Sequence, residues 1–467
     1  MRSAGSSPLT RTLMESVTAR LTEGSVGRHI VTMTVPVLFG ITTMMAQGLI
    51  DTWFIGQVGD RELAAFGFGF PILMIVTSVA IGLGAGTSSV VARAIGANDF
   101  RRARRLATDS LFLSFVITAV ISLAGILTID PLFRLLGAPE DMLPLIRGFM
   151  TILYSGVPFI VVGMVGMSSM RATGDTRLPS MLMVMASILN VILDPILIFG
   201  LGPVPKMGLN GAAMAALLAR GIIFLGTLYL MRYRLNMLSY NKPDPVELRK
   251  SWIDILHVGI PAAGTNAIVP IGAAIITAMI ARFGPEAVAG FGVATRIEAM
   301  MLVSYFALSA IIGPFVGQNF AANKEQRILR ALSLCALFCL GSGVLIAIML
   351  AALAGYLPTL FSESEKVISV TTTFLWIAPM SYGTYGMIMV MNASFNGLGR
   401  PMPAVVVSVC RIVVLYVPLA VIGMRFFAVP GIFAAYAIAN VVSGIVAYLW
   451  ARKTVQQLCL ANAGAAT

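Results

Sequence analysis

Residues 178–200 read LPSMLMVMASILNVILDPILIFG, a stretch in which Asp194 is the one charged side chain. An α-helix needs about 20 mostly apolar residues to cross the hydrocarbon core of a bilayer. This stretch has that length, and it ends at Gly200. It therefore predicts a membrane-spanning helix.

Eleven other runs share this length and apolar character, each bounded by charged residues or by Gly and Pro. No run alternates apolar and polar residues as a strand would, so we expect an all-α polytopic membrane protein with twelve spans. The expected spans are 30–56, 63–92, 106–128, 143–168, 178–200, 210–231, 255–281, 287–319, 328–353, 368–395, 403–424 and 430–451.

The composition excludes several other classes of protein. Of 467 residues, 58% are apolar and only 11% are charged, with a mean hydropathy of +0.90, whereas a soluble domain carries about 25% charged residues. These values exclude a soluble enzyme and a disordered chain. Four cysteines in a chain of this length do not form a disulfide scaffold.

The positive charges predict the orientation in the membrane. Counted by alternate loops, 22 Lys and Arg fall on the side that holds both termini, seven fall on the other side, and three lie inside runs, of 32 in total. By the positive-inside rule both termini are cytoplasmic, which fits an even number of spans in a bacterial-type inner membrane. The bias also accounts for the net charge of +12 without a nucleic-acid partner.

The chain contains an internal repeat at an offset of 225 residues. The matched pairs are Pro36 with Pro261, Gly59 with Gly284, Ala64 with Ala289, Phe66 with Phe291, Gly67 with Gly292, Asn98 with Asn323, Arg102 with Arg327 and Arg105 with Arg330. Six spans in each half is an even number, so the two halves are parallel repeats. The expected organisation is a cytosolic N-terminal segment (1–28), an N-lobe with spans 1–6 (29–231), a cytosolic linker (232–254), a C-lobe with spans 7–12 (255–452) and a cytosolic tail (453–467).

Two acidic residues inside the N-lobe spans are the main functional signal. Asp51 and Asp194 lie five and six residues before the ends of their helices, hence roughly 8 to 9 Å below the outer helix ends. One turn earlier on the same face stand the amides of Gln47 and Asn190. A charge at bilayer depth is costly and usually marks a pathway or coupling site.

These groups could hold a proton or a Na⁺ ion, and Ser187 continues the same face of its helix. The alternative is that each carboxyl only accepts hydrogen bonds that fix helix packing. In the repeat alignment, Asp51 corresponds to Ile276 and Asp194 corresponds to Val417, so both C-lobe counterparts are apolar. Ion chemistry is therefore expected in the N-lobe only.

The duplicated pattern resembles the MATE (multidrug and toxic compound extrusion) family over essentially the whole chain. The residues that carry the resemblance are Pro36 and Pro261, the DTWFIG sequence at 51–56, the RATGDTR loop at 171–177 and the NGLGRP loop at 396–401. The resemblance implies export of amphipathic, usually cationic compounds against H⁺ or Na⁺ by rocking of two lobes around a central cavity. It also implies that Asp51, Asn190 and Asp194 couple the ion. The family often has Thr where this chain has Ala216, which weakens the case for Na⁺ and leaves proton coupling intact.

Other residues are assigned to the substrate cavity or to bending. Gln47, Ser187, Met44 and Glu298 are candidate cavity residues, although Glu298 could equally pair with Arg411 or another helix. Span 1 is expected to bend at Pro36, where a backbone hydrogen bond is missing. We expect a monomer that binds small amphipathic cations and the bilayer, without cofactor, ATP or nucleic acid; there is no P-loop sequence.

Two rival functions remain open at this stage. One is a lipid-linked saccharide flippase of the same superfamily, which would be expected to have a cationic cavity. The other is a membrane-embedded enzyme, which would need a convergent nucleophile, metal or acid/base set. The sequence has two histidines and no HExxH pattern, so we do not expect an enzyme.

Overall fold

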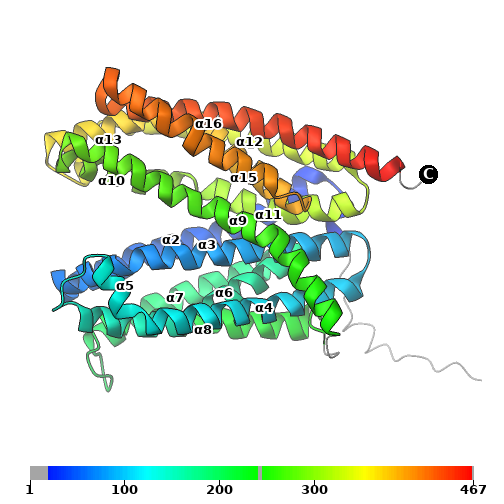
Figure 1. Ribbon diagram of the computed structural model, residues 1–467, viewed down its shortest axis with the longest axis horizontal. Coiled ribbons are helices and arrows are strands. Elements are labelled where there is room, and N and C mark those ends of the chain that lie inside the picture. Colours follow the sequence, from blue (N-terminus) through cyan, green and yellow to red (C-terminus); the bar gives the residue numbers. More distant parts are fainter. Residues whose placement is uncertain (1–18, 240–243, 465–467) are drawn as a thin grey trace, which may run out of the picture.

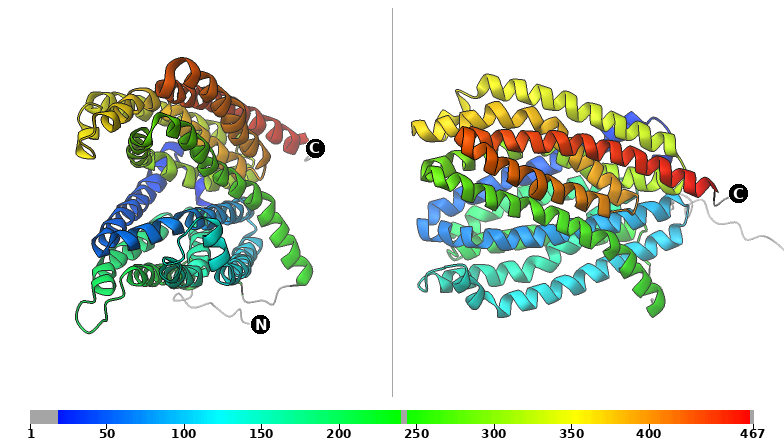
Figure 2. Two further views of the ribbon diagram at one scale, coloured as in Figure 1. Left: turned by 60° about the vertical axis from the view of Figure 1, so that its left-hand side comes forward. Right: turned by 45° about the horizontal axis from the view of Figure 1, so that its top comes forward.

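The computed structural model describes residues 19–239 and 244–464, and within these ranges every regular element is a helix. The first 18 residues of the expected N-terminal segment lie outside the described residues. Figure 1 shows two layers of helices, the first half of the chain in one and the second half in the other. Two further views show the same division (Figure 2).

The first half of the chain forms the N-lobe. Its elements are η1 (Arg20–Thr22), α2 (Val26–Val58), α3 (Asp60–Gly96), α4 (Phe100–Leu127), α5 (Ile129–Leu135), α6 (Leu143–Ala172), α7 (Arg177–Phe199), α8 (Leu209–Tyr229) and the π-helical turn η2 (Leu230–Arg234). Local signals place the starts of some helices. The Asp99 side chain, for example, accepts a hydrogen bond from the Arg102 N–H at 2.9 Å and caps α4.

The second half forms the C-lobe. Its elements are α9 (Pro245–Ile280), η3 (Ala281–Phe283), α10 (Pro285–Met301), α11 (Val303–Ala321), α12 (Glu325–Leu353), η4 (Leu357–Leu360), α13 (Glu365–Ile377), η5 (Ala378–Ser381), α14 (Tyr382–Gly397), α15 (Met402–Val409), the π-helical η6 (Cys410–Tyr416) and α16 (Val417–Gly464). Asp244 caps α9, and Pro245 occupies its first turn, where the missing N–H costs nothing.

The number of membrane crossings agrees with the sequence. Within the described residues, ten helical stretches are long and apolar enough to span a bilayer, and α10 with α11 adds an eleventh, bent by 47°. The stretch Met402–Leu460 holds two spans, because the backbone reverses at Ala428 (φ 52°, ψ −134°). The result is the expected bundle of twelve spans in two lobes.

The expected boundaries of the linker and of the C-terminal tail differ from the observed helix ends. Helix α9 begins at Pro245, so the second part of the expected linker 232–254 is helical, and Lys242 and Pro243 lie outside the described residues. Helix α16 continues to Gly464, well into the expected tail. In both places a helix continues through charged or polar residues beyond the apolar run, which a search for apolar runs does not detect.

The backbone confirms the internal repeat. Asn98 and Asn323, one repeat apart, both have a left-handed conformation, with φ of 59° and 55°. Gly59 and Gly284 both lie at the N-terminal ends of the helices that follow them. Asn tolerates positive φ better than most residues, so the same turn is built twice by the same residue type.

Helices α2 and α9 each cross from one lobe to the other. Helix α2 begins beside α12, where Gly27 faces Leu334, and then runs along α7 in the N-lobe. Helix α9 begins beside α4, where Arg102 pairs with Asp254 at 3.2 Å, and it ends in the C-lobe. This crossing is visible for α9 in Figure 1.

The lobes pack backbone to backbone near one end of the bundle, where η1 and the C-terminal end of α16 lie; we call it the terminal end (right in Figure 1). A Cβ at Gly86 would lie 2.3 Å from the Ile255 carbonyl oxygen, and one at Gly96 would lie 2.2 Å from that of Gln318. The Ser89 hydroxyl also donates to the Asn396 carbonyl at 2.5 Å. Only glycine permits such contacts between α3 and the C-lobe helices.

The segment Arg20–Thr22, which we call the strap, ties both lobes together at this end. Its Leu21 is 1% exposed, and the Leu21 N–H donates to Gln318, whose amide donates in turn to the Ala172 carbonyl of the N-lobe at 2.7 Å. Arg327 donates to the carbonyls of Leu21, Glu23 and Gly24. The strap thus bridges the ends of the two lobes.

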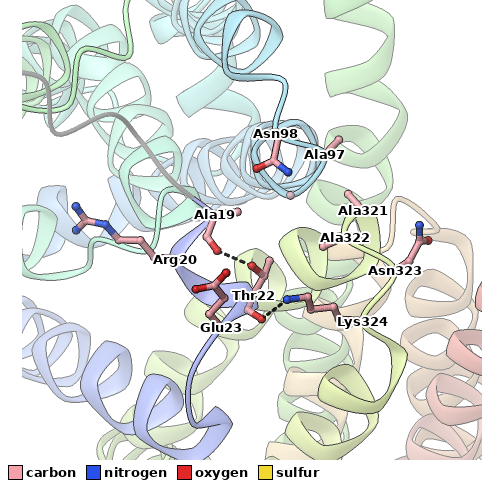
Figure 3. A pocket seen from close by; sticks show the side chains of 11 residues that line it. Ala19, Arg20, Thr22, Glu23, Ala97, Asn98, Ala321, Ala322, Asn323 and Lys324 are labelled. Atoms are coloured by element: carbon pink, nitrogen blue, oxygen red, sulfur yellow. Dashed lines mark hydrogen bonds between the residues drawn. The ribbon is translucent and has the colours of Figure 1, made fainter.

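A pocket of about 790 Å³ opens beside the strap (Figure 3). The repeat-related turns at Asn98 and Asn323 line it from the two lobes, and Lys324, which also lines it, donates to the Thr22 carbonyl. The strap and these two turns therefore lie together at the boundary between the N-lobe and the C-lobe.

Candidate functional site

The N-lobe candidates come from two adjacent helices, α2 and α7. Ser187, Asn190 and Asp194 recur at spacings of three and four along α7, so they share one face. All three are at least 98% buried, with exposures of 2%, 1% and 1%. Asp51 on α2 is half-buried and faces them.

The Asp51 carboxylate is held by two amides. Gln47 Nε2 donates to Oδ2 at 3.3 Å. In the amide orientation that satisfies its neighbours, Asn190 donates to Asp51 Oδ1 at 2.9 Å and accepts from the Ala216 N–H at 3.1 Å. The side-chain amides of Gln47 and Asn190 also contact each other. One carboxylate thus links α2, α7 and α8.

Asp194 has no comparable donors. Its carboxyl lies within hydrogen-bonding reach of the Asp51 carboxyl, and neither of its oxygens has a partner elsewhere among the described residues. Two ionised carboxylates in contact repel each other, and a buried acceptor without a donor is costly. A single proton shared by the two carboxyls would remove both costs, and a bound cation would do the same.

The sequence analysis did not assign Arg220 to the site around Asp51. Arg220 on α8 lies one helical turn after Ala216 and interacts electrostatically with Asp51. The signal was present, because Arg220 is a charge inside an apolar run. Its partner could not be read from sequence, since α2 and α8 are separated by more than 150 residues.

Of the remaining candidate residues, some lie near Asp51 and Asp194 and others lie elsewhere. Met44 shares the face of Gln47 and Asp51 on α2 and is 39% exposed. Pro36 lies inside α2, which continues through it, and lines an apolar cavity of about 440 Å³ against α7.

Glu298 belongs to a different cluster from the other cavity candidates. It lies in the C-lobe on α10, where it accepts a hydrogen bond from the Tyr436 hydroxyl at 2.5 Å. Its hydrogen-bond partner is thus on another helix, α16, which was one of the alternatives left open by the sequence.

Comparison with known proteins agrees with this architecture. The family model named MatE matches residues 36–196 and, again, residues 261–422. The chain belongs to the MATE family. The double match confirms the repeat, and because MATE proteins are transporters, this one is a multi-pass membrane transporter and not an enzyme.

Individual MATE relatives cover nearly the whole chain. A protein of Shewanella oneidensis named "FAD transporter" is 39% identical over 433 residues, 93% of this chain and 96% of that protein. The "Multidrug export protein MepA" of Staphylococcus aureus is 22% identical over 424 residues, 89% and 91% of the two chains. Among solved structures, the Vibrio cholerae MATE transporter VcmN in the bent form superposes with a TM-score of 0.88 at 30% identity, covering 96% of this chain and 99% of that one.

Proposed function

We propose that this MATE transporter exports amphipathic aromatic molecules in exchange for protons, by alternating access between its two lobes. The observation that carries the proposal is the buried Asp194 carboxyl, which lies close to the Asp51 carboxyl and has no hydrogen-bond donor within the described residues. One proton shared by the two carboxyls removes their repulsion and gives Asp194 a hydrogen bond, with no other ligand needed. Because Ala216 offers no hydroxyl, a Na⁺ ion would find fewer oxygen ligands here than in relatives with threonine.

The exchange follows from what one proton does to the pair. When the proton leaves, Asp51 and Asp194 repel each other, and α2 and α7, which carry them, are driven apart. Helix α2 can yield at Pro36, where the helix lacks one hydrogen bond and borders the apolar cavity. Proton uptake restores the close pair and favours the arrangement described above.

The orientation of the scheme rests on the distribution of positive charge. We place the terminal end in the cytoplasm because 22 of the loop Lys and Arg lie on that side and seven on the other. The tight glycine contacts and the strap then close the cytoplasmic side. Substrate released from this state leaves outward, and protons enter from outside through the same opening.

Two substrate classes follow from the relatives. The similarity to multidrug exporters supports amphipathic cations. The 39% identity to a protein named "FAD transporter" supports a flavin nucleotide, which is amphipathic and aromatic but anionic. Both classes are tested by the same assay.

The test is transport in everted vesicles or proteoliposomes with proton and Na⁺ gradients imposed separately, using ethidium and FAD as probes. We expect a proton gradient to drive wild-type transport of at least one probe, and Asp51→Asn and Asp194→Asn to reduce it to the rate of empty vesicles. Asp60→Asn, which removes an exposed carboxylate at the start of α3, is the matched control and should transport normally.

Two results would contradict the proposal. If Asp51→Asn still transports against a proton gradient, the carboxyl pair is not the coupling site. If only a Na⁺ gradient drives the wild type, the coupling ion is Na⁺ and the proton scheme is wrong.

A further inference from the structure

A second buried polar cluster lies in the C-lobe, centred on Arg411. This residue lies in the π-helical turn η6 and is only 5% exposed. Its Nη1 donates to Asn440 Oδ1 at 2.9 Å, and Asn440 Nδ2 donates to the Ser381 hydroxyl at 3.1 Å. Both partners are fully buried, so the guanidinium is held in one place.

The charge of Arg411 is not neutralised by an ion pair. Within the described residues no carboxylate lies within 4.0 Å of the guanidinium, and its Nε has no hydrogen-bond acceptor. Glu298 acts on it only from a distance and is engaged instead by Tyr436. A buried cation at membrane depth is costly, and such residues usually mark a substrate or ion pathway.

The Tyr385 ring lies over this cation, and further tyrosines are grouped nearby. The Arg411 guanidinium carbon lies 4.8 Å from the centroid of the Tyr385 ring, and the Tyr436 ring lies 5.3 Å from the Tyr416 ring. Tyr385 and Tyr436 are half-buried, whereas Tyr382 is fully buried. The Tyr382 hydroxyl has no hydrogen-bond partner in the described part of the chain, although buried tyrosines usually find one.

The repeat shows that this cluster belongs to one lobe only. At the offset of 223 residues that matches Pro195 with Pro418, the N-lobe counterpart of Arg411 is Ile188, which is 53% exposed. The acidic pair is therefore specific to the N-lobe, and Arg411 is specific to the C-lobe. A π-helical turn at this position is consistent with a functional role, since such turns occur often at functional sites.

We propose that the Arg411 cluster binds the exported substrate, and that it selects a flat aromatic molecule carrying a phosphate or another anionic group. The Arg411 Nε–H and the Tyr382 hydroxyl donate to the anionic or carbonyl oxygens of the substrate, and the Tyr385 and Tyr436 rings contact its aromatic face. A cationic drug would instead meet an unneutralised guanidinium. The inference rests on the export function proposed above and names the substrate class that it carries.

The test measures equilibrium binding of FAD, riboflavin and ethidium to the full-length purified protein by dialysis. Riboflavin has the ring system of FAD without its phosphates, and ethidium is a flat cation. Wild type should bind FAD more tightly than riboflavin. Arg411→Lys keeps the charge but loses the planar set of donors, so FAD affinity should fall on the order of ten- to a hundredfold, and riboflavin affinity less.

Tyr382→Phe separates binding from folding. It removes only a hydroxyl that has no partner in the protein, so the melting temperature should stay unchanged or rise, while FAD affinity falls about fivefold. Tyr356→Phe, at a tyrosine that is 63% exposed in the C-lobe, is the matched control and should change neither value.

The outcomes separate this inference from the proposed function. It is overturned if both variants bind FAD as the wild type does, or if Arg411→Lys lowers affinity for all three probes equally. It is also overturned if the wild type binds no FAD while a proton gradient drives ethidium export through Asp51 and Asp194, and that result leaves the proposed function standing. If a proton gradient drives transport of neither ethidium nor FAD by the wild type, the proposed function is overturned instead.

Discussion

Replacing Gly96 by alanine should weaken closure of the terminal end. Gly96 is the last residue of α3, and an added Cβ would lie 2.2 Å from the Gln318 carbonyl oxygen and 2.7 Å from its Cα, both on α11 of the other lobe. Ordinary contact begins near 3.4 Å, so the lobes must separate by about 1 Å. Overpacking of this kind costs about 1–3 kcal/mol.

That cost applies only when the lobes are packed at this end. The gain in helix propensity from Gly to Ala is present in every state and cancels. A difference of about 1–3 kcal/mol shifts the equilibrium between the packed and the separated arrangement about 5- to 150-fold. Gly67→Ala on the same helix is the control, because no atom lies within 4 Å of its Cβ position.

The shift is measurable as a distance between spin labels on the two lobes. Cysteines at the exposed positions Arg101 and Gln326 carry the labels, with the half-buried Cys410 and Cys459 replaced by serine. Gly96→Ala should raise the long-distance population in double electron–electron resonance, and Gly67→Ala should match the wild type. An unchanged distance distribution and an unchanged export rate in Gly96→Ala would refute the reasoning.

Three further predictions concern other parts of the molecule. Arg327→Gln removes three charge-assisted bonds, one to Leu21 of the strap and two to Glu23 and Gly24 directly after it, so proteolysis near Arg20 should accelerate severalfold; Arg330→Gln, at an exposed position, should leave it unchanged. Ala216→Thr adds a hydroxyl beside Asn190, so Na⁺ should raise the melting temperature of this variant more than that of the wild type; equal effects would place the hydroxyl away from the ion. The hydrogen bond from Arg147 lowers the pKa of Asp130 in the α5 loop, so the stabilisation is present at neutral pH and is lost as the pH falls below the ordinary carboxyl range; melting temperatures of wild type and Arg147→Gln should converge below about pH 4.

The sequence alone predicted the spans and the repeat because both depend on local patterns. A run such as 178–200 is recognisable from its own residues, and Asn98 and Asn323 match at a constant offset. Helix ends were less predictable where charged or polar residues extend a helix past the apolar run, as at Pro245 and Gly464. Neither residue lies in a stretch apolar enough to be counted as a span.

The candidate site was predictable on α7 but not across helices. Helical spacing put Ser187, Asn190 and Asp194 on one face, and the structure buries all three. Equal depth suggested that Asp51 lies beside Asp194. The pairing of Glu298 with Tyr436 and the electrostatic contact of Arg220 with Asp51 depend on long-range packing, which no local pattern encodes.

The acidic pair of the N-lobe and the buried Arg411 of the C-lobe have no charged counterparts at the repeat-related positions, and this asymmetry constrains how exchange works. The acidic pair lies in the N-lobe, and its repeat-related positions in the C-lobe are Ile276 and Val417. Arg411 lies in the C-lobe, and its repeat-related position in the N-lobe is Ile188. If proton and substrate occupy different lobes, they do not compete for the same atoms, and they are coupled through the packing between lobes. Gly96→Ala should then change the export rate without changing its dependence on the proton gradient, whereas Asp51→Asn should remove that dependence. Direct competition of proton and substrate at Asp51 would instead make Asp51→Asn lose substrate binding together with the dependence on the proton gradient.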